Sequence, residues 1–279
     1  MFVIGAGLFL VTILIALIGP LFYSVTMEDG LGAQYALPST RYWLGLDYFG
    51  RDYVSLLIRG LRSSLYVGLI AGVIATTIGT LVGLFGGFKG GLVDDILNML
   101  TNLFVVIPSF VVLILISSAL ERRSLALVAV IIGMTTWTWS ARAVRAQSAA
   151  LKSKDHISLA KLNGDSTLRV LLIHILPYIF SYVFMVFILQ VSSGILSEAA
   201  ISMIGLGPTG DNAVSLGIIL NEAKNYEAMG KGHWFAFIPA TVVITLIVFA
   251  LYLINTSMEG VFNPRLRKYG EETGQYGYI

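Results

Sequence analysis

Long runs of apolar residues, separated by shorter polar segments, dominate the chain. Six such runs lie at residues 2–23, 64–88, 96–119, 124–145, 174–196 and 234–255. A helix needs about 20 predominantly apolar residues to cross a hydrocarbon core about 30 Å thick. Backbone groups in lipid must hydrogen-bond within their own segment, and these runs do not alternate as barrel strands do. The pattern predicts an all-α membrane protein with six transmembrane helices.

Composition agrees with this class. Of 279 residues, 56% are hydrophobic and 12% are charged, whereas about 25% are charged in soluble domains. The net charge of +2 and the lack of a long basic run argue against nucleic-acid binding. Without cysteine the chain forms no thiolate metal site, and because His156, His174 and His233 lie far apart in the sequence, we expect no metal site.

Charge near the ends of the runs predicts the orientation in the cell membrane. Six Lys and Arg residues lie between positions 142 and 169, and short cytoplasmic loops are enriched in both residue types. We place this loop in the cytoplasm, with Arg142 and Arg145 anchored at the inner headgroups. The first run lacks the basic leader and cleavage site of a secretory signal. It is therefore expected to remain as a span, and six spans then place both termini in the cytoplasm.

The second run carries two rows of small residues. The first row is Gly68, Gly72, Thr76 and Thr80, and the second row is Gly79, Gly83 and Gly87. Small residues let a neighbouring helix approach closely. Packing within the subunit is the favoured interpretation, and a subunit interface or a pore lining remains open.

Five residues in the runs or at their ends are candidates for a translocation path. Pro108 predicts a kink in the third run, which could be a hinge or a static bend. Glu198 would be costly if it faced lipid, so we expect it to point inward, either to a structural partner such as an arginine or to the cargo path. Asn102, Gln190 and Ser193 could line the path, and hydrogen bonds between helices would explain them equally well.

The longest polar interruption covers residues 152–169. Asp155 can cap a short helix there, and Asn163-Gly164 can end that helix in the left-handed conformation. Asp165 or Ser166 can cap the next helix, which continues into the fifth run. Periodicity alone leaves open whether this helix–turn–helix binds a soluble partner or is a solvated connection.

Several motifs resemble a known family, in the same order along the chain. Asp-His-Ile-Ser-Leu-Ala-Lys-Leu-Asn-Gly at 155–164 and Ile-His-Ile-Leu-Pro at 173–177 resemble the cytoplasmic Glu-Ala-Ala loop of ABC-importer permeases. Leu-Gly-Leu-Asp-Tyr-Phe-Gly-Arg-Asp at 44–52 resembles a signature of the dipeptide, oligopeptide and nickel importers. Further landmarks lie at 60–65, 86–91, 198–207 and 263–267. The ordered set resembles the C-type member of the paired permeases.

The resemblance implies a permease subunit of an ATP-driven importer, divided into a first span with an outer segment (1–60), a transmembrane core (61–262) and a cytoplasmic tail (263–279). The implied partners are a second homologous permease subunit, two cytoplasmic ABC ATPases, an external solute-binding protein and membrane lipid. The binding protein would deliver cargo to residues 24–59 and 205–232. One of the ATPases would dock on the short polar helix, at Asp155, Ile157, Ser158, Leu159, Ala160, Leu162 and Gly164.

No Gly-x-x-x-x-Gly-Lys-Ser/Thr loop occurs in the sequence. ATP and Mg²⁺ are therefore expected in the ATPases, and this chain is expected to be non-catalytic and to bind no cofactor itself. Di- or oligopeptides are the expected cargo, with oligosaccharides or nickel as alternatives. A secondary transporter or channel would need mid-membrane charges, and an intramembrane enzyme would need a nucleophile with its base. The runs show little of either pattern.

The sequence also departs from the family pattern. Ser158 and Leu159 stand where Glu and Ala are usual, and Ser158 cannot close a capping box as Glu would. We expect a less rigid start of the docking helix and retained docking. Leu216 replaces a usual Trp.

Overall fold

The computed structural model describes residues 1–23, 28–210 and 213–262. The predicted tail and the motif at 263–267 lie outside these ranges. The described regular elements are helical and follow in this order: α1 (Phe2–Phe22), α2 (Tyr53–Lys89), α3 (Gly91–Val106), α4 (Ser109–Ser118), α5 (Leu125–Leu151), α6 (Asp155–Leu162), α7 (Thr167–Arg169), the π-helical segment η1 (Val170–Ile175), α8 (Leu176–Met203), α9 (Leu216–Asn225), the 3₁₀ turn η2 (Trp234–Ala236) and α10 (Ile238–Phe262).

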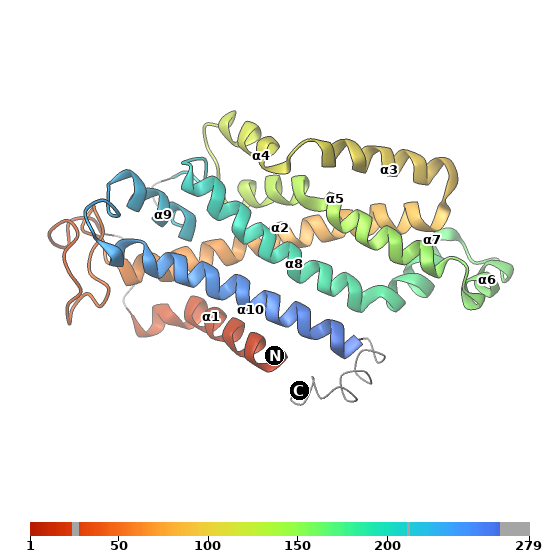
Figure 1. Cartoon of the computed structure of the whole chain (residues 1–279), viewed down its shortest axis with the longest axis horizontal. Coiled ribbons are helices and arrows are strands. Elements are labelled where there is room, and N and C mark those ends of the chain that lie inside the picture. The colour runs from red at the N-terminus through yellow and green to blue at the C-terminus, as the bar shows by residue number, and fades with distance from the viewer. Residues whose placement is uncertain (24–27, 211–212, 263–279) are drawn as a thin grey trace.

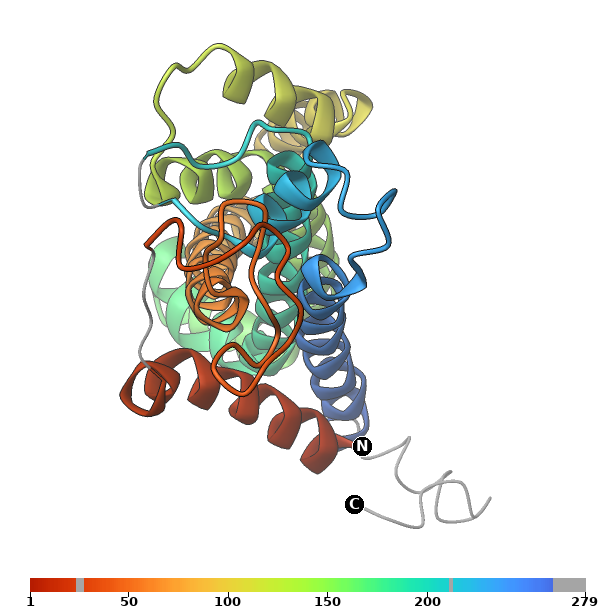
Figure 2. The same ribbon diagram turned by 90° about the vertical axis from the view of Figure 1, so that its left-hand side faces the viewer.

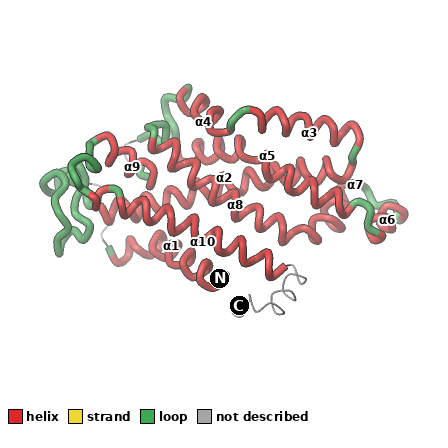
Figure 3. The backbone as a smooth tube through the Cα atoms, viewed as in Figure 1, coloured by secondary structure: helices red, strands yellow, loops and turns green. Residues whose placement is uncertain are grey.

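The helices form an elongated bundle with α6 at one end and α9 near the opposite end (Figure 1). Figure 3 shows that most loop segments gather at these two ends. Five helices, with α7, η1 and α8 continuous as one, are long and apolar enough to cross a membrane. The bent pair α3–α4 gives a sixth span when it is counted as one. The predicted all-α membrane class is confirmed.

The long helix α2 begins at Tyr53, well before the predicted start at residue 64. The side chain of Asp52 caps it by accepting hydrogen bonds from the Ser55 N–H at 3.0 Å and the Ser55 hydroxyl at 2.7 Å. With 37 residues, the helix is about 55 Å long at about 1.5 Å per residue. It therefore extends beyond a hydrocarbon core of about 30 Å.

Both small-residue rows of α2 pack inside the subunit. A Cβ atom added at Gly83, in the second row, would lie 2.6 Å from the carbonyl oxygen of Ala141 in α5. One added at Gly72, in the first row, would lie 2.6 Å from Cγ2 of Val191 in α8. These distances are shorter than any ordinary carbon contact. The favoured interpretation of the rows is confirmed.

The third span is broken at Pro108. α3 ends at Val106, Ile107 is extended, and Pro108 occupies the N-cap position of α4. The two helices are bent by 73°. Proline has no N–H and disfavours helical geometry in the residue before it. The predicted kink is confirmed, and it is a complete interruption.

The first and last spans lie against each other. A Cβ atom added at Gly5 would lie 2.8 Å from Cβ of Leu253, so the start of α1 contacts the second half of α10. Figure 2, viewed along the bundle, shows α1 running across the view while most of the long helices are seen nearly end-on. α1 is therefore steeply tilted against the rest of the bundle.

Candidate coupling and translocation sites

The short helix α6 begins differently from the prediction. Lys154 occupies its N-cap position without a side-chain hydrogen bond, and Asp155 is its first helical residue. The prediction that Asp155 caps this helix is therefore wrong. An acidic residue in the first turn still interacts favourably with the positive end of the helix dipole.

The end of α6 follows the prediction. Gly164 has φ +83°, its N–H donates to the Lys161 carbonyl at 3.0 Å, and the Asp165 N–H donates to the Ala160 carbonyl at 3.1 Å. These two bonds form a Schellman motif, which requires a left-handed residue. Ser166 then caps α7 by accepting the Arg169 N–H at 3.4 Å.

One face of α6 is buried against the bundle and the other is exposed. Ile157 is 0% exposed and Ala160 is 4% exposed, both packed in a cluster with residues of α2, α5 and η1. Leu159 and Leu162 are 59% and 83% exposed. Asp155, Ser158 and Gly164 are also exposed. This corrects the predicted docking set, because Ile157 and Ala160 hold α6 to its own chain and have no free surface for a partner.

Two further contacts join this end of the bundle to α6. The Nζ atom of Lys161 lies 4.5 Å from the ring centroid of Phe88, near the end of α2. Asp165 lies 3.0 Å from Nε2 of His174, and His174 belongs to the π-helical segment that leads into α8. α6 is thus tied to α2 and, through the turn that follows it, to α8.

Two of the predicted path residues line a groove between α4, α5 and α8. Its volume is about 320 Å³, and its lining residues are Ser109, Thr135, Thr136, Thr138, Trp139, Leu189, Gln190 and Ser193. Gln190 is 4% exposed, whereas Ser193 is half-buried. The other three predicted path residues do not line this groove.

Asn102 and Pro108 lie on α3 and at the break after it. Oδ1 of Asn102 accepts a hydrogen bond from Nη2 of Arg142 at 2.8 Å. Arg145 forms a two-pronged pair with Asp94, with both N–O distances at 2.6 Å. The two arginines therefore join α5 to α3, and their anchoring at the inner headgroups stays a prediction. Pro108 is exposed at the break.

Glu198 is fully enclosed by protein at 0% exposure. Its carboxyl oxygens accept hydrogen bonds from the hydroxyls of Ser64 at 2.9 Å and Ser202 at 2.6 Å. Ser64 Oγ in turn accepts the N–H of Leu216, the first residue of α9, at 3.2 Å. Glu198 therefore points inward in a structural role, and its partners are serines in place of the arginine given as an example.

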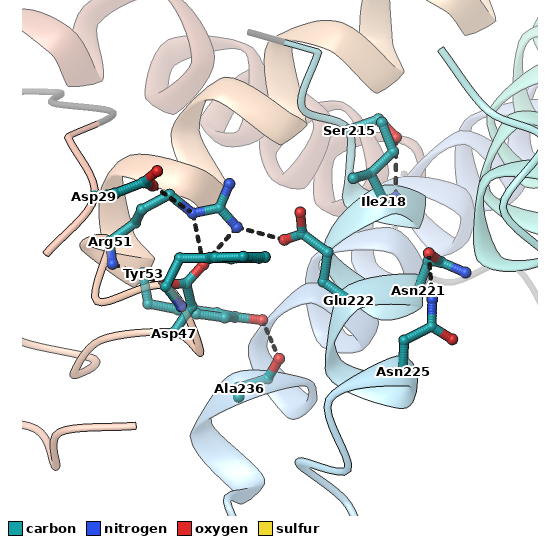
Figure 4. A network of polar contacts seen from close by, with 11 residues as sticks. Asp29, Asp47, Arg51, Tyr53, Ser215, Ile218, Asn221, Glu222, Asn225 and Ala236 are labelled. Carbon is teal, nitrogen blue, oxygen red and sulfur yellow. Dashed lines mark hydrogen bonds and ion pairs between the residues drawn. The ribbon is translucent and has the colours of Figure 1, made fainter. Parts of the chain in front are cut away.

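A charged cluster at the end opposite α6 joins the segment before α2 to α9 (Figure 4). Arg51 donates from Nε to Oδ2 of Asp47 at 2.7 Å, and from Nη2 to Oε2 of Glu222 at 2.5 Å. Burial acts to lower the pKa of Arg51, but the two carboxylates outweigh it and raise that pKa above its ordinary value. Burial also raises the pKa of Glu222. This cluster was not predicted from the sequence, in which the charges at Asp47 and Arg51, each close to a glycine, were the one local signal.

Removing the guanidinium should cost more than removing one acid. In Arg51→Met, two poorly solvated carboxylates lose their counter-ion, which we expect to cost about 3 kcal/mol of stability. In Glu222→Gln, Arg51 keeps Asp47, and we expect a loss of about 1 kcal/mol. Thermal unfolding midpoints of the purified variants measure the difference. Equal midpoints for both variants would contradict the cluster's role.

The elements above define a multi-pass α-helical membrane protein with a broken span, a polar groove and a surface helix at one end. Residues 68–268 match the family described as "Binding-protein-dependent transport system inner membrane component". The chain belongs to this family, which confirms the resemblance found in the sequence.

Known relatives are similar over most of their lengths. The dipeptide transport system permease protein DppC of Bacillus subtilis (strain 168) is 30% identical over 267 residues, covering 94% of this chain and 82% of the relative. The oligopeptide transport system permease protein OppC of the same organism is 30% identical over 95% of this chain and 86% of its own. OppC of Lactococcus lactis subsp. cremoris (strain SK11) is 28% identical over 83% of this chain and 79% of the relative. The chain is a membrane permease component of a transport system.

Proposed function

We propose that this chain is one of two permease subunits of an ATP-driven importer of di- or oligopeptides. The family match over residues 68–268 carries this proposal. The names of the relatives, which are dipeptide and oligopeptide permeases, support the cargo. The groove, which is lined mainly by hydroxyl and amide side chains, is chemically suited to a polar cargo.

In the proposed assembly, two ATPases bind ATP and Mg²⁺, and one of them docks on the exposed face of α6. Leu159 and Leu162 offer this face two unpartnered apolar side chains. Closure of the ATPases would move α6, and the buried contacts of Ile157 and Ala160 would pass the movement to the bundle. Such a bundle must have two conformations, and the state of the attached ATPases must shift the equilibrium between them.

The proposed orientation places α6 in the cytoplasm and the Arg51 cluster outside the cell. With six spans, both termini then lie in the cytoplasm. The solute-binding protein would meet the outer face, where the segment before α2 lies beside α9 (Figure 4). The second permease subunit would complete the path alongside the groove.

The substitution Gly164→Val tests this assembly. Gly164 has φ +83°, and a Cβ atom added there would have no neighbour within 4 Å, so the main effect of a side chain is strain of the backbone. That strain costs a residue with a Cβ atom about 1–2 kcal/mol, and about tenfold weaker ATPase binding is expected if it disrupts the docking face. Co-purification of the ATPases with the tagged chain, over a range of ATPase concentrations, measures the effect.

The matched control is Gly232→Val. Gly232 has φ +73° and equally open surroundings, but it lies in the segment between α9 and η2, far along the chain from α6. We expect this variant to recruit ATPases as the wild type does. Equal recruitment by Gly164→Val would refute docking on α6, and failure of the wild-type assembly to recover any ATPase would refute the proposed function.

A further inference from the structure

The groove between α4, α5 and α8 lies beside the break at Pro108. Ser109, the first residue of α4, forms part of its wall. Non-helical backbone at membrane depth is tolerated where it is buried in protein or lines a water-filled cavity. Both Pro108 and Ser109 are exposed in this chain, so the break fits a cavity wall better than a packed core.

The side chain of Gln190 is held with its carbonyl oxygen free. Its Nε2 atom donates to the Thr136 carbonyl at 3.1 Å and to the hydroxyl of Ser140. A backbone carbonyl can only accept, so the amide cannot be turned the other way without placing two acceptors together. Both N–H groups are therefore used inside the protein. In the described part of the chain, Oε1 has no hydrogen-bond partner, and the residue, 4% exposed, lines the groove.

Two hydroxyls of the groove have also used their protons. Thr135 Oγ1 donates to the carbonyl of Ile132 at 2.9 Å, and Thr136 Oγ1 donates to the same oxygen at 2.9 Å. Each hydroxyl has one proton and two lone pairs, so these two side chains can offer only acceptors to a ligand. Thr135, Thr136 and Gln190 thus present fixed acceptors, and none of the described lining residues carries a formal charge.

The hydroxyls of Ser109, Thr138 and Ser193 supply the complementary donors. They have no hydrogen-bond partner among the described residues and can rotate to donate or accept. The first N–H groups of a helix also lack intrahelical partners, and α4 begins at Ser109. The groove therefore offers fixed acceptors on Thr135, Thr136 and Gln190. Its possible donors are spread over all three helices, with Ser109 on α4, Thr138 on α5 and Ser193 on α8.

We propose that this groove binds the amide groups of the cargo, in which Oε1 of Gln190 accepts a hydrogen bond from a cargo N–H and the free hydroxyls of the groove donate to a cargo carbonyl. This inference rests on the proposed function and adds the site and the recognised group. An amide offers one donor and one acceptor side by side, which matches the two kinds of group that line the groove. A groove lined by uncharged groups can form hydrogen bonds with the backbone of a peptide, and it does not select peptides by the charge of their side chains.

The absence of cysteine from the sequence makes a direct test practicable. Ser193→Cys places one thiol in the groove, and Ser192→Cys, on the adjacent buried residue whose hydroxyl bonds the Ile188 carbonyl, is the matched control. Both are assembled with the second permease subunit, the ATPases and the binding protein in proteoliposomes. A membrane-impermeant cationic thiol reagent is added, with or without trialanine, and the mass of this subunit reports modification.

We expect the Ser193→Cys thiol to react and the Ser192→Cys thiol to stay unmodified. Trialanine should slow the reaction about tenfold when about nine in ten grooves are occupied. Gln190→Leu in the Ser193→Cys background should abolish this protection. Ser140→Ala, which removes an internal partner of Gln190 but leaves Oε1 in place, should retain it.

Three results would overturn the assignment. The first is a Ser193→Cys thiol that does not react with the reagent in any nucleotide state. The second is a thiol that reacts equally fast in the presence and absence of trialanine. The third is equal loss of protection in Gln190→Leu and Ser140→Ala. ATPase recovery and ATP-dependent trialanine uptake are measured on the same preparations. If both persist, the groove assignment alone fails; if both are missing in the unsubstituted assembly, the proposed function fails with it.

Discussion

Replacing Gly83 by leucine should leave little folded permease. A Cβ atom at this position would lie 2.6 Å from the Ala141 carbonyl oxygen, 2.8 Å from the Arg145 nitrogen and 2.9 Å from Cβ of Val144. Two of these neighbours are backbone atoms of α5, so α2 and α5 would have to separate. Overpacking of this kind typically costs about 1–3 kcal/mol and more where backbones must move. Size-exclusion profiles and thermal midpoints of the detergent-solubilised chain measure the loss.

Gly7→Leu is the control for Gly83→Leu. It adds the same volume to a span, but a Cβ atom at Gly7 has no neighbour within 4 Å, so we expect a profile like that of the wild type. Gly83→Ala should lie between the two. If Gly83→Leu and Gly7→Leu gave the same monodisperse peak, close approach of α2 to α5 would be excluded.

Features that depend on local physics could be predicted from the sequence. Apolar length located the spans, because burial in lipid requires about 20 residues. Gly164 and Ser166 marked the turn after α6, since a left-handed residue and a cap each have few suitable side chains. The break at Pro108 follows from a missing N–H. The start of α2 at Asp52 was missed because Arg59 and Arg62 interrupt the apolar run that follows the cap.

Features that depend on pairing across the chain could not be predicted. The partners in the hydrogen bonds of Glu198 with Ser64 and of Arg51 with Glu222 are 134 and 171 residues apart. Nothing in either local sequence distinguishes these partners from other polar residues. The arginine given as an example of a partner for Glu198 followed from the usual pairing of charges in membranes, whereas the structure satisfies the carboxyl group with hydroxyls. The π-helical segment η1 had no recognised signal either.

The same limit applies to the coupling and translocation residues. Exposure divides the predicted docking set, because Ile157 and Ala160 lie on the inner side of α6 and Leu159 and Leu162 on the outer side. The path residues divide similarly, with Gln190 and Ser193 at the groove. The sequence correctly showed that these polar positions are unusual for residues in lipid. Only the packing of α4, α5 and α8 could tell which of them share a surface.

Replacing Glu198 by alanine should release the start of α9 from the bundle. The carboxyl group receives two serine hydroxyls, and Ser64 in turn holds the N–H of Leu216. Alanine would leave these buried groups without an acceptor and open a cavity, which together we expect to cost on the order of 3 kcal/mol. The thermal midpoint should fall, and proteolysis should cleave the α9 region faster than in the wild type.

Glu198→Gln separates hydrogen bonding from charge. Glutamine keeps one carbonyl acceptor in nearly the same volume, and its N–H groups can donate to a serine oxygen once that hydroxyl rotates. We therefore expect a loss of about 1 kcal/mol or less and near-normal protection of α9. A Gln variant as unstable as the Ala variant would mean that the site needs a carboxyl group itself. An Ala variant with the wild-type midpoint would show that α9 is held mainly by its glycine contact, in which a Cβ atom at Gly217 would lie 2.7 Å from the Ala199 carbonyl oxygen.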